Sequence, residues 1–131
     1  MTIHCGCDVG VDFVKKHLIQ LKRDKHSVEC VQACAEHLPF RNKCFESTVF
    51  TETIEHVVYP KLALSEVCRV GKQLILTTPL TYIPDHIRLY SLNDILSLVN
   101  EFITIEYFTK LEEAGIVTVF IKGRCKCHQK Y

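Results

Sequence analysis

The sequence predicts an α/β fold, in which helices cover both faces of an open, mostly parallel sheet with a C-terminal antiparallel hairpin. Segments rich in β-branched and aromatic residues alternate with segments in which apolar residues recur at helical spacing. The last two strand-like segments, 102–108 and 116–121, are joined through residues 112–115, which is typical of a hairpin. The chain has 131 residues, enough for one domain with a single core.

The first half of the chain contains three predicted strands and one predicted helix. Thr2–Cys5 has the composition of a short strand, and residues 6–10, which begin and end with glycine, predict a turn. Apolar residues then recur at helical spacing from residue 11 to residue 21, so a helix is predicted there. Residues 28–33 and 45–50 read as the second and third strands, with a polar loop between them.

The second half begins with a helix at Pro60, because proline suits the first position of a helix. Gly71 is expected to end this helix, and residues 73–78 form a fourth strand that Pro79 stops. A further helix is predicted after Ser91, since Ser91-Leu92-Asn93-Asp94 matches the acidic variant of a capping box. The hairpin completes the alternation of strands and helices.

Composition and charge exclude some classes of partner. The formal net charge of +1 gives no electrostatic argument for binding nucleic acid or an anionic membrane. No apolar run approaches the roughly 20 residues of a membrane span. The N-terminus also lacks the pattern of a secretory signal. We therefore expect a cytoplasmic protein with no nucleic-acid or membrane partner.

The chain is rich in cysteine, with eight residues of this type. In a reducing compartment they are expected to be buried apolar residues or metal ligands, whereas intracellular disulfides are a feature of hyperthermophiles. The count therefore favours a thermophilic source, although the ordinary charged fraction of 24% argues against one.

Specific roles for the cysteines remain open alternatives. The pairs Cys5/Cys7 and Cys125/Cys127 resemble half-sites for zinc, but their spacing is not the usual one and the fold should separate them. No metal site is therefore predicted. Disulfides that join Cys30 or Cys34 to Cys5, Cys7 or Cys44 are compatible with neighbouring strands and loops, and the pairing stays undecided.

The stretch Ala35-Glu36-His37-Leu38-Pro39-Phe40, followed by residues 44–54 and Glu55-His56, carries a family resemblance. It resembles the middle of class I S-adenosylmethionine-dependent methyltransferases of the small-molecule type. The resemblance covers nearly the whole chain and implies a Rossmann-like sheet. It also implies that residues 1–131 form a single truncated methyltransferase-like domain, which lacks the family's N-terminal first strand and Gly-rich loop.

The resemblance implies positions for a cofactor site. Asp8 resembles the acid at the end of the family's second strand, which accepts hydrogen bonds from both ribose hydroxyls, although it could instead cap the first helix. Cys34, Ala35 and Glu36 resemble the segment that holds the adenine. Thr51 lies in the turn beside the methionine part, and His56 is a candidate to orient or deprotonate the methyl acceptor, or a structural residue.

Two departures from the family put activity in question. The missing Gly-rich loop should pack against the methionine part of the cofactor, and Cys34 replaces an acid with a poorer acceptor. One alternative is that residues 5–10 are themselves the Gly-rich loop. Otherwise we expect the neighbours of the missing strand to pair with each other, and S-adenosylmethionine binding to be impaired or absent in the isolated chain.

Other functions remain open. The chain could be a non-catalytic binding or scaffold protein, or the subunit of a split methyltransferase. It could also be an interaction module stabilised by disulfides or zinc. A homodimer, or a partner chain that completes the sheet, belongs to these alternatives. The methyl acceptor is not predicted.

Overall fold

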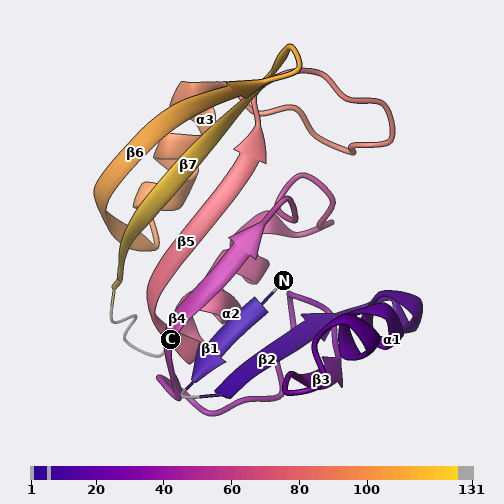
Figure 1. Ribbon diagram of the computed structural model, residues 1–131. Coiled ribbons are helices and arrows are strands. Elements are labelled where there is room, and N and C mark those ends of the chain that lie inside the picture. Colours follow the sequence, from indigo (N-terminus) through magenta and orange to yellow (C-terminus); the bar gives the residue numbers. More distant parts are fainter. Residues whose placement is uncertain (1, 6, 127–131) are drawn as a thin grey trace.

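The computed structural model describes residues 2–5 and 7–126, and these form one twisted sheet with helices on both faces (Figure 1). The strands have the spatial order β3-β2-β1-β4-β5-β7-β6. In chain order they are β1 (Thr2–Cys5), β2 (Cys7–Asp12), β3 (Glu29–Gln32), β4 (Phe45–Thr51), β5 (Gly71–Pro79), β6 (Ile103–Glu113) and β7 (Ile116–Cys125). The helices are α1 (Lys15–Asp24), α2 (Pro60–Val70) and α3 (Leu92–Asn100). The predicted fold class is confirmed.

Strand direction determines where a ligand site can form. β2 is parallel to β3, and β4 is parallel to β5. β1 is antiparallel to both β2 and β4, so these two neighbours run in the same direction as each other. The carboxyl ends of β2, β3, β4 and β5 therefore lie at one edge of the sheet, where ligands of open α/β sheets bind.

The centre of the sheet differs from the prediction. β2 and β4 do not pair with each other, because β1 of the same chain lies between them (Figure 1). Ile3 pairs with Val9 on one side and with Thr48 on the other. The predicted closure is therefore wrong, since the chain's own β1 satisfies both strand edges. The homodimer or partner chain stays a prediction.

The segment predicted as a turn is mostly strand. β2 continues through Gly10 to Asp12, and α1 begins at Lys15 instead of residue 11. A Cβ atom at Gly10 would lie 2.3 Å from Leu21 Cδ2, so this glycine allows α1 to pack closely on the strand. Cys5 and residues 7–10 thus belong to two antiparallel strands, so this part of the chain is not a Gly-rich loop that leads into a helix.

The core lies mainly between the sheet and the helices α2 and α3. α1 packs on β2 and β3, whereas α2 packs on β4 and β5, and α3 on β6. The largest fully buried apolar side chains in the described part are Phe50, Ile54, Leu64, Leu74, Leu76, Ile95, Ile103, Ile121, Val11 and Val67. Val49 and Ile75, which alternate with these core residues on β4 and β5, are only half-buried.

The predictions for the second half of the chain are confirmed with small changes in length. Pro60 is the first residue of α2, and the Ser91 hydroxyl accepts a hydrogen bond of 3.1 Å from the Asp94 N–H at the start of α3. The hairpin strands β6 and β7 are longer than predicted. Among the described helices, none combines the length and apolar character needed to cross a membrane.

Replacement of Gly123 by alanine is expected to lower the free energy of unfolding by about 2 kcal/mol, because overpacking forces the backbone to shift. A Cβ atom at Gly123 would lie 2.3 Å from the Thr104 carbonyl oxygen on the paired strand. Urea unfolding measures the change. The exposed neighbour Lys122 provides the control: Lys122→Ala should change stability by less than about 0.5 kcal/mol. Equal stability of Gly123→Ala and wild type would contradict the packing at this position.

Candidate functional site

A cavity of about 670 Å³ opens at the edge of the sheet where β2, β3 and β4 end. Its lining comes from four segments of the chain that are distant in sequence. These are residues 11–14 with residue 17, residues 33–36, residues 51–53, and residues 56–58. The volume is within the range of sites for small molecules and cofactors. The cavity thus has the position and size of a ligand site.

Asp12, the last residue of β2, is the acidic residue at the first of these strand ends. Its Oδ1 accepts a hydrogen bond of 2.7 Å from the Val14 N–H, and its Oδ2 lies 3.2 Å from His17 Nδ1. The Asp12 side chain is 30% exposed. A carboxylate offers about four acceptor positions, so this one keeps capacity for a ligand in the cavity.

The resemblance implied that Asp8 lies at the carboxyl end of a strand, the equivalent of the family's second strand, and this placement is wrong. Asp8 is the second residue of β2 and pairs with His4. It is four residues, or about 13 Å, from the strand's carboxyl end. It does not cap α1 either, because that helix begins after Val14. The alternation Val9-Gly10-Val11 before Asp12 was the signal that could have placed the strand end correctly.

The predicted adenine segment does line the cavity. Cys34, Ala35 and Glu36 follow the end of β3 and contribute to the wall. Leu38, two residues further along, is 5% exposed. The ring of Phe40 packs edge-on against Phe45 at 5.0 Å. This packing anchors the loop that carries the three cavity residues.

Glu66 and Arg69 on α2 bind the backbone of the same loop. Glu66 Oε2 accepts a hydrogen bond of 2.8 Å from the Leu38 N–H. The Arg69 guanidinium donates to the Leu38 carbonyl at 2.9 Å and to the Phe40 carbonyl at 2.7 Å. Arg69 also donates two hydrogen bonds to the Glu66 carboxylate, at 2.7 and 2.9 Å. The wall of the cavity is therefore held by a pair of opposite charges.

The end of β4 and the turn that follows it form the other wall, and the predicted residue Thr51 is the last residue of β4. Its carbonyl accepts a hydrogen bond of 2.8 Å from the Thr53 hydroxyl. Glu52 has a φ of 49°, and its backbone N–H donates to the Thr77 carbonyl at 3.0 Å. Glu52 Oε1 accepts from the Thr77 hydroxyl at 3.2 Å. These bonds fix the acidic turn against β5.

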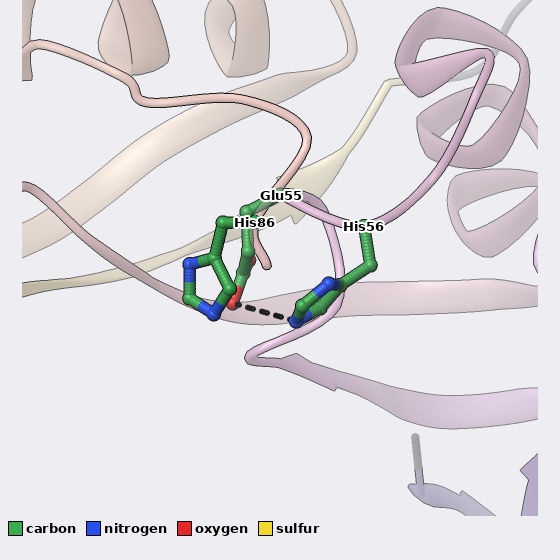
Figure 2. A group of neighbouring side chains, drawn as sticks. All are labelled: Glu55, His56 and His86. Atoms are coloured by element: carbon green, nitrogen blue, oxygen red, sulfur yellow. Dashed lines mark ion pairs between the residues drawn. The ribbon is translucent and has the colours of Figure 1, made fainter. Parts of the chain in front are cut away.

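Glu55, His56 and His86 lie together next to this turn (Figure 2). Glu55 is 1% exposed, and its Oε2 accepts a hydrogen bond of 3.0 Å from the Thr78 hydroxyl. Burial raises the pKa of Glu55 to about 7, and the nearby charge of Glu52 adds to the increase. The sequence motif predicts His56 as a site candidate, whereas Glu55 and His86 were not predicted. The motif contained Glu55, whereas only the fold brings His86 close.

The structure tests some of the roles that were left open for the cysteines. Cys30 and Cys34 are thiols, so the disulfides proposed for them are not formed. Cys125 lies beside the buried thiol of Cys68 on α2, to which it is hydrogen-bonded. Three strands separate β2 from β7, which puts Cys7 and Cys125 about 19 Å apart, too far to share one ion. Cys127 and the side chains of Cys5 and Cys7 lie outside the described part.

Comparison with known protein families decides what kind of domain this is. A family model described as a methyltransferase domain matches residues 4–74, more than half of the chain. The chain belongs to the class I S-adenosylmethionine-dependent methyltransferases. The matched segment of this methyltransferase domain includes β2, β3, β4 and α2. All the residues that line the cavity lie within this segment. A search of curated proteins found no match to the sequence.

Solved structures agree with this assignment at the level of the fold. The PH0226 protein from Pyrococcus horikoshii OT3 has a TM-score of 0.75 and 19% identity over 90% of the methyltransferase domain and 71% of its own chain. The cyclase SpnF has a TM-score of 0.76 and 12% identity over 89% and 66%. The N-terminal domain of EvdMO1, solved with S-adenosylhomocysteine bound, has a TM-score of 0.61 and 16% identity over 90% and 64%.

The likeness lies in the fold and does not extend to length. The methyltransferase domain spans between 64% and 71% of the three proteins. One of the three is a cyclase, so the fold does not by itself define the reaction. The function must therefore be argued from the residues of the cavity.

Proposed function

We propose that this methyltransferase-family chain holds the adenosine part of S-adenosylmethionine in its cavity and holds the methionine part poorly. Methyl transfer by the isolated chain is then impaired. The observation that carries the proposal is the position of Asp12 and residues 33–36, which meet at the ends of β2 and β3 and line one cavity. The ribose and the adenine of adenosine are joined to each other. Binding both parts therefore requires residues at two neighbouring strand ends, as found here.

The residues of the cavity fit the nucleoside. The Asp12 carboxylate would accept hydrogen bonds from the ribose hydroxyls, while the Val14 N–H keeps it oriented. Residues 34–36 would pack against the adenine, with Cys34 as a poor acceptor for its amino group. Asp12, Glu36 and Glu52 give the lining an acidic character, and the described lining contains no lysine or arginine. Such a lining favours a cation.

The chemistry of the bound cofactor would be donation of its sulfonium methyl group to a nucleophile. The protein's part in such a transfer is to hold the reactants in line. In this chain β1 runs antiparallel to β2 and β4, so the carboxyl end of β1 lies at the opposite edge of the sheet from the cavity. No Gly-rich turn among residues 2–5 and 7–126 faces the cavity to receive the methionine part with backbone N–H groups.

Calorimetry with adenosine and S-adenosylhomocysteine tests this proposal. We expect both ligands to bind with a Kd of about 0.1 mM, within about threefold of each other, because the methionine part contributes little. A Kd for S-adenosylhomocysteine more than about tenfold lower than that for adenosine would show that the methionine part is held, and would contradict the proposal. Absence of binding by both ligands would also contradict it and favour a scaffold role.

A further inference from the structure

Two loops meet beside the cavity and bring together three side chains that are typical metal ligands. Glu55 and His56 come from the turn after β4, and His86 comes from the loop between β5 and α3 (Figure 2). One ligand atom from each residue lies within 4.8 Å of the others. Glu55 Oε1 is 4.0 Å from His56 Nε2, and the two imidazole rings are edge-to-face with centroids 4.4 Å apart.

The buried carboxylate of Glu55 has an oxygen that the protein leaves unsatisfied. Oε2 is bound by the Thr78 hydroxyl, but Oε1 is buried and has no hydrogen-bond partner. A buried carboxylate oxygen without a donor or a cation is costly, and such groups are rare in folded proteins. Oε1 is the oxygen that lies 4.0 Å from His56 Nε2, so it is on the His56 side of the carboxylate (Figure 2). A cation between the three side chains would satisfy it.

We infer that Glu55, His56 and His86 bind a divalent transition-metal ion, with Zn²⁺ as the ion that suits them best. Two imidazoles and one carboxylate form a donor set that Zn²⁺ uses at sites with an open coordination position. Mg²⁺ prefers oxygen ligands in octahedral geometry, so it should bind far more weakly.

The geometry requires only a small adjustment. Ligand atoms at about 2.0 Å from a tetrahedral Zn²⁺ are about 3.3 Å from each other, so the widest separation must shrink by at most about 1.5 Å. His56 is 47% exposed, which leaves its ring room to turn. Arg88 donates hydrogen bonds to the carbonyls of Val57 and Val58, so the two loops are already tied together.

The ion would lie next to the proposed cofactor cavity, because His56 also lines that cavity. Three protein ligands leave the fourth position of Zn²⁺ for water or for an oxygen, nitrogen or sulfur atom of a methyl acceptor. This role of the ion rests on the proposed function. The binding of the ion does not, because it depends only on the three side chains.

Titration of the chelator-treated full chain with Zn²⁺ tests the inference. We expect one ion per chain, with Mg²⁺ at least about a hundredfold weaker. His86→Ala and His56→Ala should each weaken Zn²⁺ binding by more than about tenfold. His26→Ala removes an exposed histidine at the end of α1 and should change nothing. Unchanged Zn²⁺ affinity in His86→Ala would overturn the inference.

Cobalt provides a second readout, because the eight cysteines could also bind Zn²⁺. Co²⁺ bound by Glu55, His56 and His86 gives only weak visible bands, whereas thiolate ligands add intense charge-transfer absorption in the near ultraviolet. Weak bands that disappear in Glu55→Gln support the site. That variant keeps an acceptor for the Thr78 hydroxyl, and thermal unfolding without metal checks that it folds. An intense charge-transfer band that survives His86→Ala would assign the metal to thiols and overturn the site. Calorimetry with adenosine in His86→Ala measures nucleoside binding by itself, so loss of the metal site can be distinguished from failure of the proposed function.

Discussion

Replacement of Arg69 by alanine is expected to lower the free energy of unfolding by about 3 kcal/mol. Arg69 is 31% exposed, and its guanidinium donates to two backbone carbonyls of the loop that forms one wall of the cavity. It also pairs with Glu66, which itself accepts a hydrogen bond from the Leu38 N–H. The variant leaves partly buried carbonyls and a partly buried carboxylate without their charged donor, and this loss is the source of the expected effect.

Urea unfolding measures this loss of stability, and two further variants test its cause. Arg69→Lys should recover less than half of it, because an ammonium group cannot reproduce the forked set of hydrogen bonds. Arg41→Ala removes an exposed arginine from the same loop and should cost less than about 0.5 kcal/mol. If Arg69→Ala and Arg41→Ala unfold alike, the loop is not held by the charged pair.

The pH dependence of the Arg69→Ala effect has a defined sign. Burial disfavours the charge of Glu66, but the hydrogen bonds from Arg69 and the Leu38 N–H, together with the charge of Arg69, outweigh burial and lower its pKa below the usual 4.5. A group with a lowered pKa in the folded state stabilises the protein above its unfolded pKa, and this contribution disappears as the pH falls through the folded pKa. The difference in stability between wild type and Arg69→Ala should therefore shrink below about pH 4.5.

The parts of the fold that could be predicted are those for which local sequence and tertiary packing agree. Pro60 at the start of α2 and Ser91 at the cap of α3 act through their own backbone or their nearest neighbours, so their positions follow from residue type. The hairpin could be recognised from two β-rich runs and a short turn. In these segments nothing distant in sequence changes the outcome.

The arrangement of the N-terminal strands could not be predicted because tertiary contacts decide it. Gly10 by its residue type favours a turn, but it is a strand residue on which Leu21 packs. The direction of β1 follows from its pairing with β4, more than forty residues away, which no local pattern encodes. Because the strand was predicted to end too early, Asp8 was predicted as the ribose-binding acid in place of Asp12. The same limit applies to His86, which joins Glu55 only through the fold.

Comparison of Asp12→Asn with Asp8→Asn should separate the two assignments of the ribose-binding acid. We expect Asp12→Asn to weaken adenosine binding by about tenfold, or about 1.4 kcal/mol, since it replaces a carboxylate acceptor by a neutral amide. Asparagine can still accept the Val14 N–H hydrogen bond at the start of α1, so the fold should be kept. Asp8→Asn should change the affinity by less than about twofold, because Asp8 is about 13 Å from the carboxyl end of β2.

Calorimetry with adenosine, at a pH where both aspartates are ionised, makes this comparison, and the two substitutions are matched in chemistry. A larger loss in Asp8→Asn than in Asp12→Asn would mean that the nucleoside binds away from the carboxyl edge of the sheet. Equal small losses would mean that neither carboxylate touches the ribose. A loss confined to Asp12→Asn ties binding to the end of β2, where the strand edge, the start of α1 and the cavity coincide. In that case this chain keeps the nucleoside half of the family's site, although an antiparallel strand occupies the centre of its sheet.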